Sequence, residues 1–332
     1  MRKWLALAVL VQSALAGTAT DVSFTEISPL SANLEIARRM LTPLTAARIP
    51  AELSRSGKTL DGQPIDPAKE QFLLYVPDRA PPQGYGLMVF VPPWQDARLP
   101  DGWAPVLDRH GMIFVSAAHS GNVESVLGRR VPLALLAEQN VALRYRLDPE
   151  RIIIAGFSGG ARVAMSIALA YPDVFRGALL NAGSDPIATL EVPLPPRELF
   201  ARFQSSRLVY VSGENDAGAL ATDTASTRAM RRWCVFGLIS QVTPRTGHAV
   251  AEPVEFARAL GKLDAPFGQD EERLADCRAQ IERKLSDELG HVRSLIARDP
   301  PAARRALDEL DMKYGGLAAP ASLEIAGRIA PD

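Results

Sequence analysis

The stretch from residue 151 to residue 161 constrains the fold of this chain more than any other. It reads Arg-Ile-Ile-Ile-Ala-Gly-Phe-Ser-Gly-Gly-Ala. The three isoleucines favour a β-strand, and the alanine-rich segment that follows favours a helix. Ser158 lies at the sharp turn between them, and the flanking glycines tolerate the close contacts of such a turn. A Gly-x-Ser-x-Gly turn in this context exposes the serine hydroxyl, so Ser158 is the candidate nucleophile; the alternative is a purely structural turn.

Short apolar runs recur along the chain and alternate with helix-compatible segments from about residue 86 to residue 260. Continuous apolar runs of this length indicate parallel strands that are buried on both faces. We therefore expect an α/β fold with a doubly wound, mostly parallel sheet. The predicted strands are 72–76, 86–91, 112–116, the isoleucine stretch, 175–180, 207–212 and 238–242, and two predicted helices are 132–145 and 224–235.

The first sixteen residues have the features of a secretory signal peptide. Two basic residues precede a short apolar segment, and Ala14-Leu15-Ala16 supplies small residues for cleavage after Ala16. We expect residues 1–16 to be removed and the mature protein to be secreted or periplasmic; the alternative is a buried helix. The apolar segment is too short to span a bilayer, so no membrane span is expected.

The mature chain is expected to have one main domain over residues 17–265, which includes an N-terminal extension. A helix is expected to begin at Ser28-Pro29, since proline is favoured at the first helical position. Residues 51–69 are rich in Gly, Pro, Ser and charged residues, and we expect them to form a loop.

Two later stretches interrupt the alternation of strands and helices. The proline-rich insertion 185–206 is expected to form part of a lid or wall of the substrate pocket, or else a passive surface loop. Residues 266–332 are expected to form a helical tail, because apolar residues recur every three or four positions from residue 270. Further helices are expected to start at Asp299-Pro300 and to run over 321–329.

Composition excludes several classes of partner. The 332 residues carry a formal net charge of -1 and no basic run, so we expect no binding to nucleic acid. Cys234 and Cys277 are the two cysteines, and they show no metal-type spacing; we expect no metal and no cofactor. In an exported protein they either form a disulfide that pins the tail to the main domain or stay as buried thiols.

A serine hydroxyl becomes a nucleophile when a histidine removes its proton, and a carboxylate holds that histidine in the required tautomer. The chain has four histidines, so the search is short. His248 follows the last predicted strand and comes after Ser158, which is where a catalytic loop histidine belongs. His110 precedes a strand, His119 comes before the serine in the chain, and His291 is in the tail, so His248 is the candidate base.

The acid should follow one of the strands between the serine and the histidine. Glu214 and Asp216 both follow the strand 207–212, and the Gly-x-x-Asp spacing favours Asp216. Asp185, after the preceding strand, is the third candidate. The alternative for Asp216 is a structural helix or turn cap, a role that aspartate often has.

The developing oxyanion needs two backbone N–H donors. Gly159, the residue after the nucleophile, is the first candidate. The second donor is expected in the loop after the strand 86–91, but Pro92 and Pro93 have no N–H. Trp94 is the first residue of that loop that can donate, and Gln95 is the next.

These motifs resemble those of the α/β-hydrolase superfamily, and in particular its secreted poly(3-hydroxybutyrate) depolymerase and feruloyl-esterase branch. The resemblance covers about residues 70 to 260 and excludes the tail. Members usually carry His-Gly after the third strand, where this chain has Pro92-Pro93-Trp94. The matching motifs are Tyr75-Val-Pro77, Asp148-Pro149-Glu150-Arg151-Ile152, Gly156-Phe-Ser-Gly-Gly160, Tyr171-Pro172, Gly213-Glu-Asn-Asp216 and Gly247-His248.

The resemblance implies an exported serine esterase that cleaves a small-molecule or oligomeric ester through an acyl-enzyme. No substrate-binding module or Ser/Thr-rich linker is visible, which favours a small ester over a polymer. One alternative is a serine peptidase, because the same triad cleaves amides. Another is a non-catalytic binding protein that kept the fold, an interpretation that the Pro92-Pro93-Trp94 loop motivates. The oligomeric state stays open.

Overall fold

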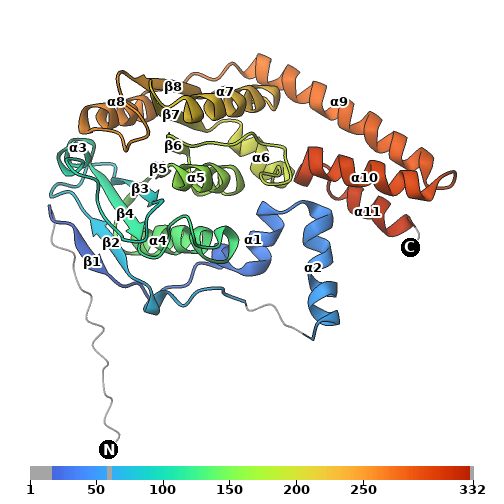
Figure 1. Cartoon of the computed structure of the whole chain (residues 1–332), viewed down its shortest axis with the longest axis horizontal. Helices are drawn as coiled ribbons and strands as arrows, with labels where there is room; N and C mark the ends of the chain where they lie inside the picture. The colour runs from blue at the N-terminus through green and yellow to red at the C-terminus, as the bar shows by residue number, and fades with distance from the viewer. Residues whose placement is uncertain (1–16, 58–61, 330–332) are drawn as a thin grey trace, which may run out of the picture.

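The computed structural model describes residues 17–57 and 62–329, and a single eight-stranded sheet is its centre (Figure 1). The spatial order is β1-β2-β4-β3-β5-β6-β7-β8, in which β2 is antiparallel to β1 and β4 and the other pairs are parallel. This confirms the predicted α/β class with a mostly parallel sheet. The proposed signal, residues 1–16, lies outside the described residues. The strands are β1 Thr20–Val22, β2 Phe72–Tyr75, β3 Tyr85–Val91, β4 Met112–Ala117, β5 Leu147–Phe157, β6 Gly177–Asn181, β7 Arg207–Gly213 and β8 Leu238–Thr243.

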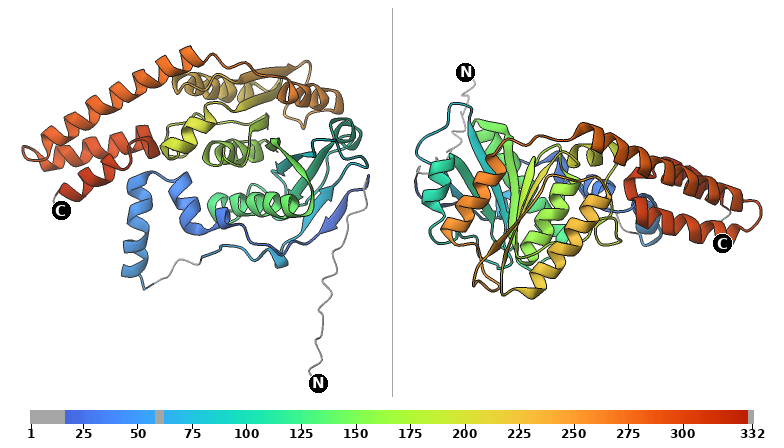
Figure 2. Two further views of the ribbon diagram at one scale, coloured as in Figure 1. Left: turned by 180° about the vertical axis from the view of Figure 1, so that it is seen from behind. Right: turned by 90° about the horizontal axis from the view of Figure 1, so that it is seen from above.

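Helices cover both faces of the sheet, as Figure 2 shows from above. Side chains alternate between two buried clusters along each central strand, which explains why these strands are apolar throughout. In β3, Leu87 and Val89 face one layer, whereas Met88 and Phe90 face the other. The first layer contains α4 Val131–Arg144, α5 Gly159–Ala170 and α7 Ala217–Arg232, and the second contains α3 Ala104–His110 and α8 Pro253–Asp264.

The N-terminal extension differs from the expectation. The helix that starts at Pro29 is a single 3-10 turn, because Ala32 is extended; α1 Asn33–Met40 then begins. A further helix, α2 Pro43–Arg55, takes in the start of the segment expected to be loop. Its last turns are built from Ala, Glu, Leu and Arg, all good helix formers, and these outweigh the internal Pro50.

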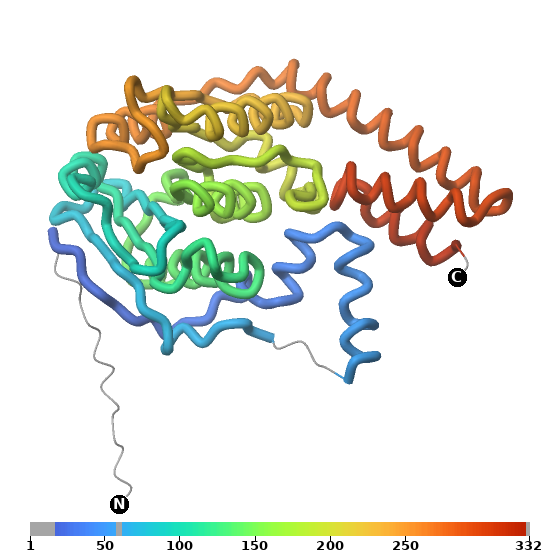
Figure 3. Tube along the Cα trace, viewed as in Figure 1, coloured from blue at the N-terminus to red at the C-terminus, as the bar shows by residue number. Residues whose placement is uncertain are grey.

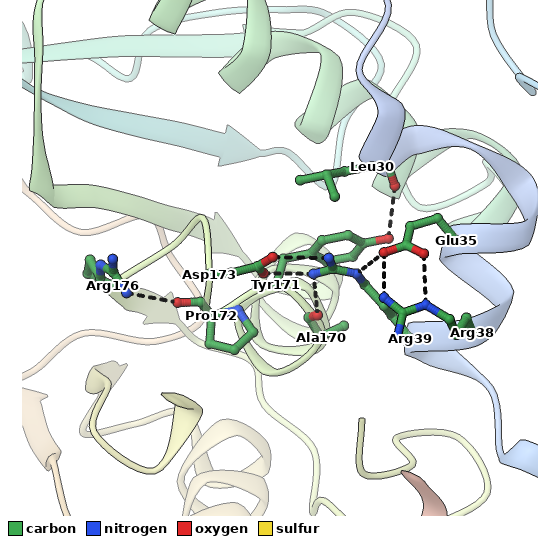
Figure 4. Close-up of polar contacts among 9 residues, drawn as sticks. All are labelled: Leu30, Glu35, Arg38, Arg39, Ala170, Tyr171, Pro172, Asp173 and Arg176. Atoms are coloured by element: carbon green, nitrogen blue, oxygen red, sulfur yellow. Dashed lines mark hydrogen bonds and ion pairs between the residues drawn. The ribbon is translucent and has the colours of Figure 1, made fainter. Parts of the chain in front are cut away.

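A buried polar network joins α1 to the end of α5 (Figure 4). We call Glu35, Arg39, Tyr171 and Asp173 the anchor cluster. The guanidinium of Arg39 donates to both carboxylate oxygens of Asp173, at 2.7 and 3.0 Å, and to Glu35 at 2.6 Å. Its carbon lies 4.7 Å from the centre of the Tyr171 ring, and Tyr171 donates its hydroxyl to the carbonyl of Leu30. Every charge in this network has a partner.

Two elements begin at other residues than the sequence predicts. α7 begins at Ala217, seven positions before the expected start, because the Asp216 carboxylate accepts a hydrogen bond from the Ala219 N–H and caps the helix. The strand expected at 175–180 is β6, Gly177–Asn181.

The proline-rich insertion packs against the C-terminal tail, so it is not a passive surface loop. Residues of the insertion form α6 Arg197–Phe203, and Leu194 and Pro195 contact the glycine pair Gly315-Gly316 so closely that a Cβ on either glycine would lie within 2.5 Å of backbone. The insertion is therefore a seat for the C-terminal tail. Prolines suit this role because their rigid backbone presents carbonyls at fixed positions.

The tail consists of α9 Glu271–Leu295, α10 Pro300–Tyr314 and α11 Ala321–Arg328. Helix α9 packs along α10 and α11, and these two helices lie beside α2 (Figure 3). The apolar faces of the tail join the same buried cluster as α4 and α5. A disulfide between Cys234 and Cys277, with Cα atoms 5.8 Å apart, ties the start of α9 to the end of α7. None of the described helices is long and apolar enough to cross a membrane.

Candidate active site

Ser158 stands at a strained turn between β5 and α5. Its backbone has φ 55° and ψ -124°, a region that residues with a side chain rarely adopt. The turn fits because small residues surround it: a Cβ on Gly160 would lie 2.0 Å from the carbonyl oxygen of Val91. The Ser158 N–H donates to the carbonyl of Asn181, which fixes the elbow to the neighbouring strand β6. This backbone conformation directs the Ser158 hydroxyl away from the sheet.

The structure brings together three of the side chains named from the sequence. Nε2 of His248 lies 2.8 Å from Oγ of Ser158, and Nδ1 lies 2.6 Å from Oδ2 of Asp216. We call these three residues the candidate triad. The His248 side chain is 50% exposed, whereas that of Asp216 is 10% exposed. The chain of hydrogen bonds therefore runs from a shielded carboxylate to a hydroxyl that solvent can reach.

Asp216 has both of the roles that the sequence left open. One carboxylate oxygen caps α7 through the Ala219 N–H, and the other accepts from His248. Burial raises the pKa of Asp216, but the hydrogen bonds from the Ala219 amide and from His248 outweigh it and place the pKa below its usual value. The group stays ionised and can hold the imidazole in one tautomer.

The two other acid candidates are engaged elsewhere. The Glu214 carboxylate accepts the backbone N–H of Arg245 and so braces the loop after β8. Asp185 pairs with Arg162 of α5 at 3.3 Å. Neither is the carboxylate that contacts His248. Of the other histidines, His110 lies directly before β4, at the amino ends of the strands, and its Nδ1 is 2.7 Å from Oδ2 of Asp264.

Asn181 is a residue of this site that sequence reasoning missed. Its backbone carbonyl accepts the Ser158 N–H, and its side chain accepts the Ala251 N–H at 2.7 Å and donates to the carbonyls of Val211 and Ala249. One buried side chain thus ties the histidine loop to β7, while the same residue's carbonyl holds the elbow. The signal in the sequence is a lone asparagine at the end of an apolar strand, where a buried amide requires partners.

The expected oxyanion donors, Gly159 and Trp94, lie at the start of α5 and in the loop after β3. Gly159 is the first residue of α5, so its N–H is one of the donors that a helix leaves free. The Trp94 N–H donates no hydrogen bond within residues 17–57 and 62–329. Its ring lies 6.1 Å from that of Phe157, and the guanidinium of Arg98 stacks on it at 4.1 Å. The Trp94 indole therefore forms a wall beside the site.

A cavity of about 360 Å³ opens next to the histidine loop and is lined by Trp94, Arg98, Trp103 and Val250 among others. A larger cavity of about 550 Å³ lies at the amino ends of the strands, around Arg151, and no triad side chain lines either cavity. We assign substrate binding to the smaller cavity, because in open α/β sheets ligands bind outside the carboxyl ends of the strands. Across the described ranges, no group of three His, Cys, Asp or Glu side chains is placed to hold a metal ion.

Comparison with known proteins places this geometry in context. No family model matches the chain. A poly(3-hydroxybutyrate) depolymerase of Ralstonia pickettii is 26% identical over 138 residues, which are 37% of this chain and 28% of the depolymerase. The chain thus matches little more than a quarter of that relative's length.

Solved structures with a similar arrangement include two esterases. A ferulic acid esterase superposes with a TM-score of 0.43 at 16% identity, over 58% of this chain and 89% of its own. A thermophilic esterase of the Planctomycetes species Thermogutta terrifontis gives 0.43 at 16% identity, over 62% and 91%. The sheet order and the elbow after β5 give this chain the architecture of the α/β hydrolases, and its sequence resembles that of a poly(3-hydroxybutyrate) depolymerase.

Proposed function

We propose that this chain is an exported serine hydrolase that cleaves carboxylic esters. One observation carries the proposal: an unbroken line of hydrogen bonds from Asp216 through His248 to Ser158, at 2.6 and 2.8 Å, that ends at a strained elbow. The relative is named as a depolymerase of poly(3-hydroxybutyrate), which is a polyester. Its similarity supports an ester, and not an amide, as the bond that is cleaved.

The geometry supports the following steps. Oγ of Ser158 attacks the ester carbonyl while Nε2 of His248 takes the hydroxyl proton. The N–H groups of Gly159 and Trp94 donate to the tetrahedral oxyanion, and Asp216 stabilises the imidazolium. The alcohol leaves with the proton from Nε2. A water molecule, deprotonated by His248, then attacks the acyl-enzyme, and the acid is released as Ser158 recovers its proton.

We further propose that residues 1–16 are an export signal that is cleaved after Ala16, so that the protein is secreted or periplasmic. The Cys234–Cys277 disulfide supports this, because disulfides persist in oxidising compartments. On this view residues 17–265 carry the chemistry and the tail, 266–332, supports them.

The deciding experiment is a panel of p-nitrophenyl esters and peptide anilides, run on the wild type and on Ser158→Ala, together with a fluorophosphonate probe. We expect turnover of the esters, labelling of the wild type, and loss of both in the variant. Faster cleavage of the anilides would favour a peptidase. A folded wild type that the probe does not label, and that captures a partner through residues 270–332, would favour a binding protein.

A further inference from the structure

The loop after β4, residues 118–125, lies directly beside the elbow. A Cβ atom placed on Gly159 would lie 2.3 Å from Oδ1 of Asn122 and 3.0 Å from its Nδ2. The Asn122 carboxamide therefore packs against the Cα atom of Gly159, which is one bond from the Gly159 N–H. That N–H is the first donor of the proposed oxyanion hole, so the carboxamide lies where it can add a donor to those of Gly159 and Trp94.

The polar atoms of this carboxamide are available to a ligand. Asn122 is exposed, and its side chain makes no hydrogen bond to any residue that the structure describes. An asparagine amide has two N–H donors and one acceptor, and a half-turn about Cβ–Cγ exchanges them. Since no protein group fixes the amide, a negatively charged oxygen selects the orientation in which Nδ2 faces it.

The proline loop that lacks N–H donors holds Asn122 in place through its carbonyls. The Asn122 N–H donates to the carbonyl of Pro93 at 3.0 Å. Arg130 is buried and donates to the carbonyls of Pro92 and Ser120, both at 2.9 Å, so one guanidinium ties the two loops together. Burial lowers the pKa of Arg130 to about 10, which leaves it charged at neutral pH. The asparagine backbone is thus fixed while its side chain stays unpaired.

We propose that Asn122 is a catalytic residue whose Nδ2 donates a hydrogen bond to the oxyanion, alongside the N–H of Gly159. This rests on the proposed ester hydrolysis at Ser158 and extends it. A side-chain donor explains how the site stabilises negative charge although the preceding loop begins with two prolines. It also explains why position 159 is glycine: any Cβ there would displace the carboxamide.

The test compares Asn122→Ala and Asn122→Asp with Val123→Ala, a control at the neighbouring position, whose side chain is 85% exposed. Removing one oxyanion donor lowers kcat by about a hundredfold or more. We expect such a loss for Asn122→Ala, a larger one for Asn122→Asp, whose carboxylate repels the oxyanion, and none for the control. KM should change little, because the ground-state carbonyl gains less from the donor than the oxyanion does.

A trifluoromethyl ketone gives a second readout, because Ser158 adds to it and forms a stable oxyanion. Its inhibition constant should rise in Asn122→Ala by about the factor by which kcat/KM falls, with the thermal midpoint unchanged. An Asn122→Ala variant with wild-type kcat and wild-type inhibition would overturn this proposal alone. A wild type that turns over no ester and binds no ketone would overturn the proposed function as well.

Discussion

The candidate triad and the anchor cluster are made of the same ingredients. Each has a carboxylate joined to a basic side chain by short hydrogen bonds, and each includes a hydroxyl. The hydroxyl of Ser158 is bonded to His248, whereas that of Tyr171 donates to the carbonyl of Leu30. They differ in how far their side chains are exposed and paired with other protein groups. Arg39 is 5% exposed, and its donors go to Glu35, Asp173 and the carbonyl of Ala170. Arginine also keeps its proton at any physiological pH, so this cluster cannot pass a proton on.

The triad has the opposite design. The His248 side chain is half exposed, and the hydroxyl of its partner Ser158 makes no other hydrogen bond among the described residues. We therefore expect the anchor cluster to contribute to stability and the candidate triad to contribute to activity. The difference can be tested by asking which property each substitution changes.

The largest effect is expected for His248→Ala. If the triad is catalytic, kcat should fall by at least about 10⁴-fold without the base, as it does in serine hydrolases. The free energy of unfolding should change by less than about 1 kcal/mol, because the side chain is half exposed. Ester turnover and urea denaturation measure the two properties. His291→Ala, in the tail, is the matched control and should change neither; equal activity in the two variants would contradict the triad.

Asp216→Asn separates the two roles of this residue. Asparagine is as good a helix cap as aspartate, so α7 should stay intact. It cannot hold the imidazole in the tautomer that accepts from Ser158, and kcat should fall by about 10⁴-fold. Circular dichroism and turnover are the measurements. A large loss of helix content would mean that the cap, and not the chemistry, dominates.

Arg39→Met should do the reverse and change stability alone. It leaves Asp173, whose side chain is 25% exposed, without its partner, and we expect a loss of about 1–3 kcal/mol of unfolding free energy. Arg38→Met is the control, because Arg38 pairs with Glu35 while its own side chain is 53% exposed, and such pairs contribute about 1 kcal/mol or less. The kcat of the folded fraction should match the wild type in both variants. A changed kcat in Arg39→Met would show that the two regions are coupled.

The smallest effect is a pH dependence of stability that originates in the anchor cluster. The hydrogen bond from Arg38 lowers the pKa of Glu35 to about 2; burial opposes the shift, and Arg39 adds to it. The unfolded chain, with a glutamate of ordinary pKa near 4.5, binds the proton first. This contribution is therefore complete above pH 4.5 and is lost as the pH falls toward 2. Denaturation curves across this range should be less pH-dependent in Glu35→Gln.

The parts of the site that could be predicted are those that short sequence motifs specify. The elbow depends on adjacent residues, and the order of Asp216 and His248 follows from the strands they succeed, so both could be found in the sequence. The anchor cluster could not, because Arg39 and Asp173 are 134 positions apart and neither stands in a motif. The sequence suggests that the loop around Asn122 shapes the pocket, but not the donor role proposed for this residue, because no residue pattern records its contact with the Cα atom of Gly159.

The insertion 185–206 shows a different limit. Its prolines correctly indicated a break in the alternation, but a break does not reveal what packs on it. The partners, Gly315 and Gly316, come more than a hundred residues later. Whether such a segment faces a substrate or a helix is decided by tertiary packing alone.

The disulfide between Cys234 and Cys277 has a consequence for how the protein responds to proteolysis. The segment 264–268, which lies inside the loop that the bond closes, is exposed throughout. A protease that cuts there does not release the tail, because both fragments stay covalently joined and α10 and α11 keep their seat on the insertion. The nicked protein therefore remains one particle under oxidising conditions, and the triad, whose three residues all precede the cut, stays in a single fragment.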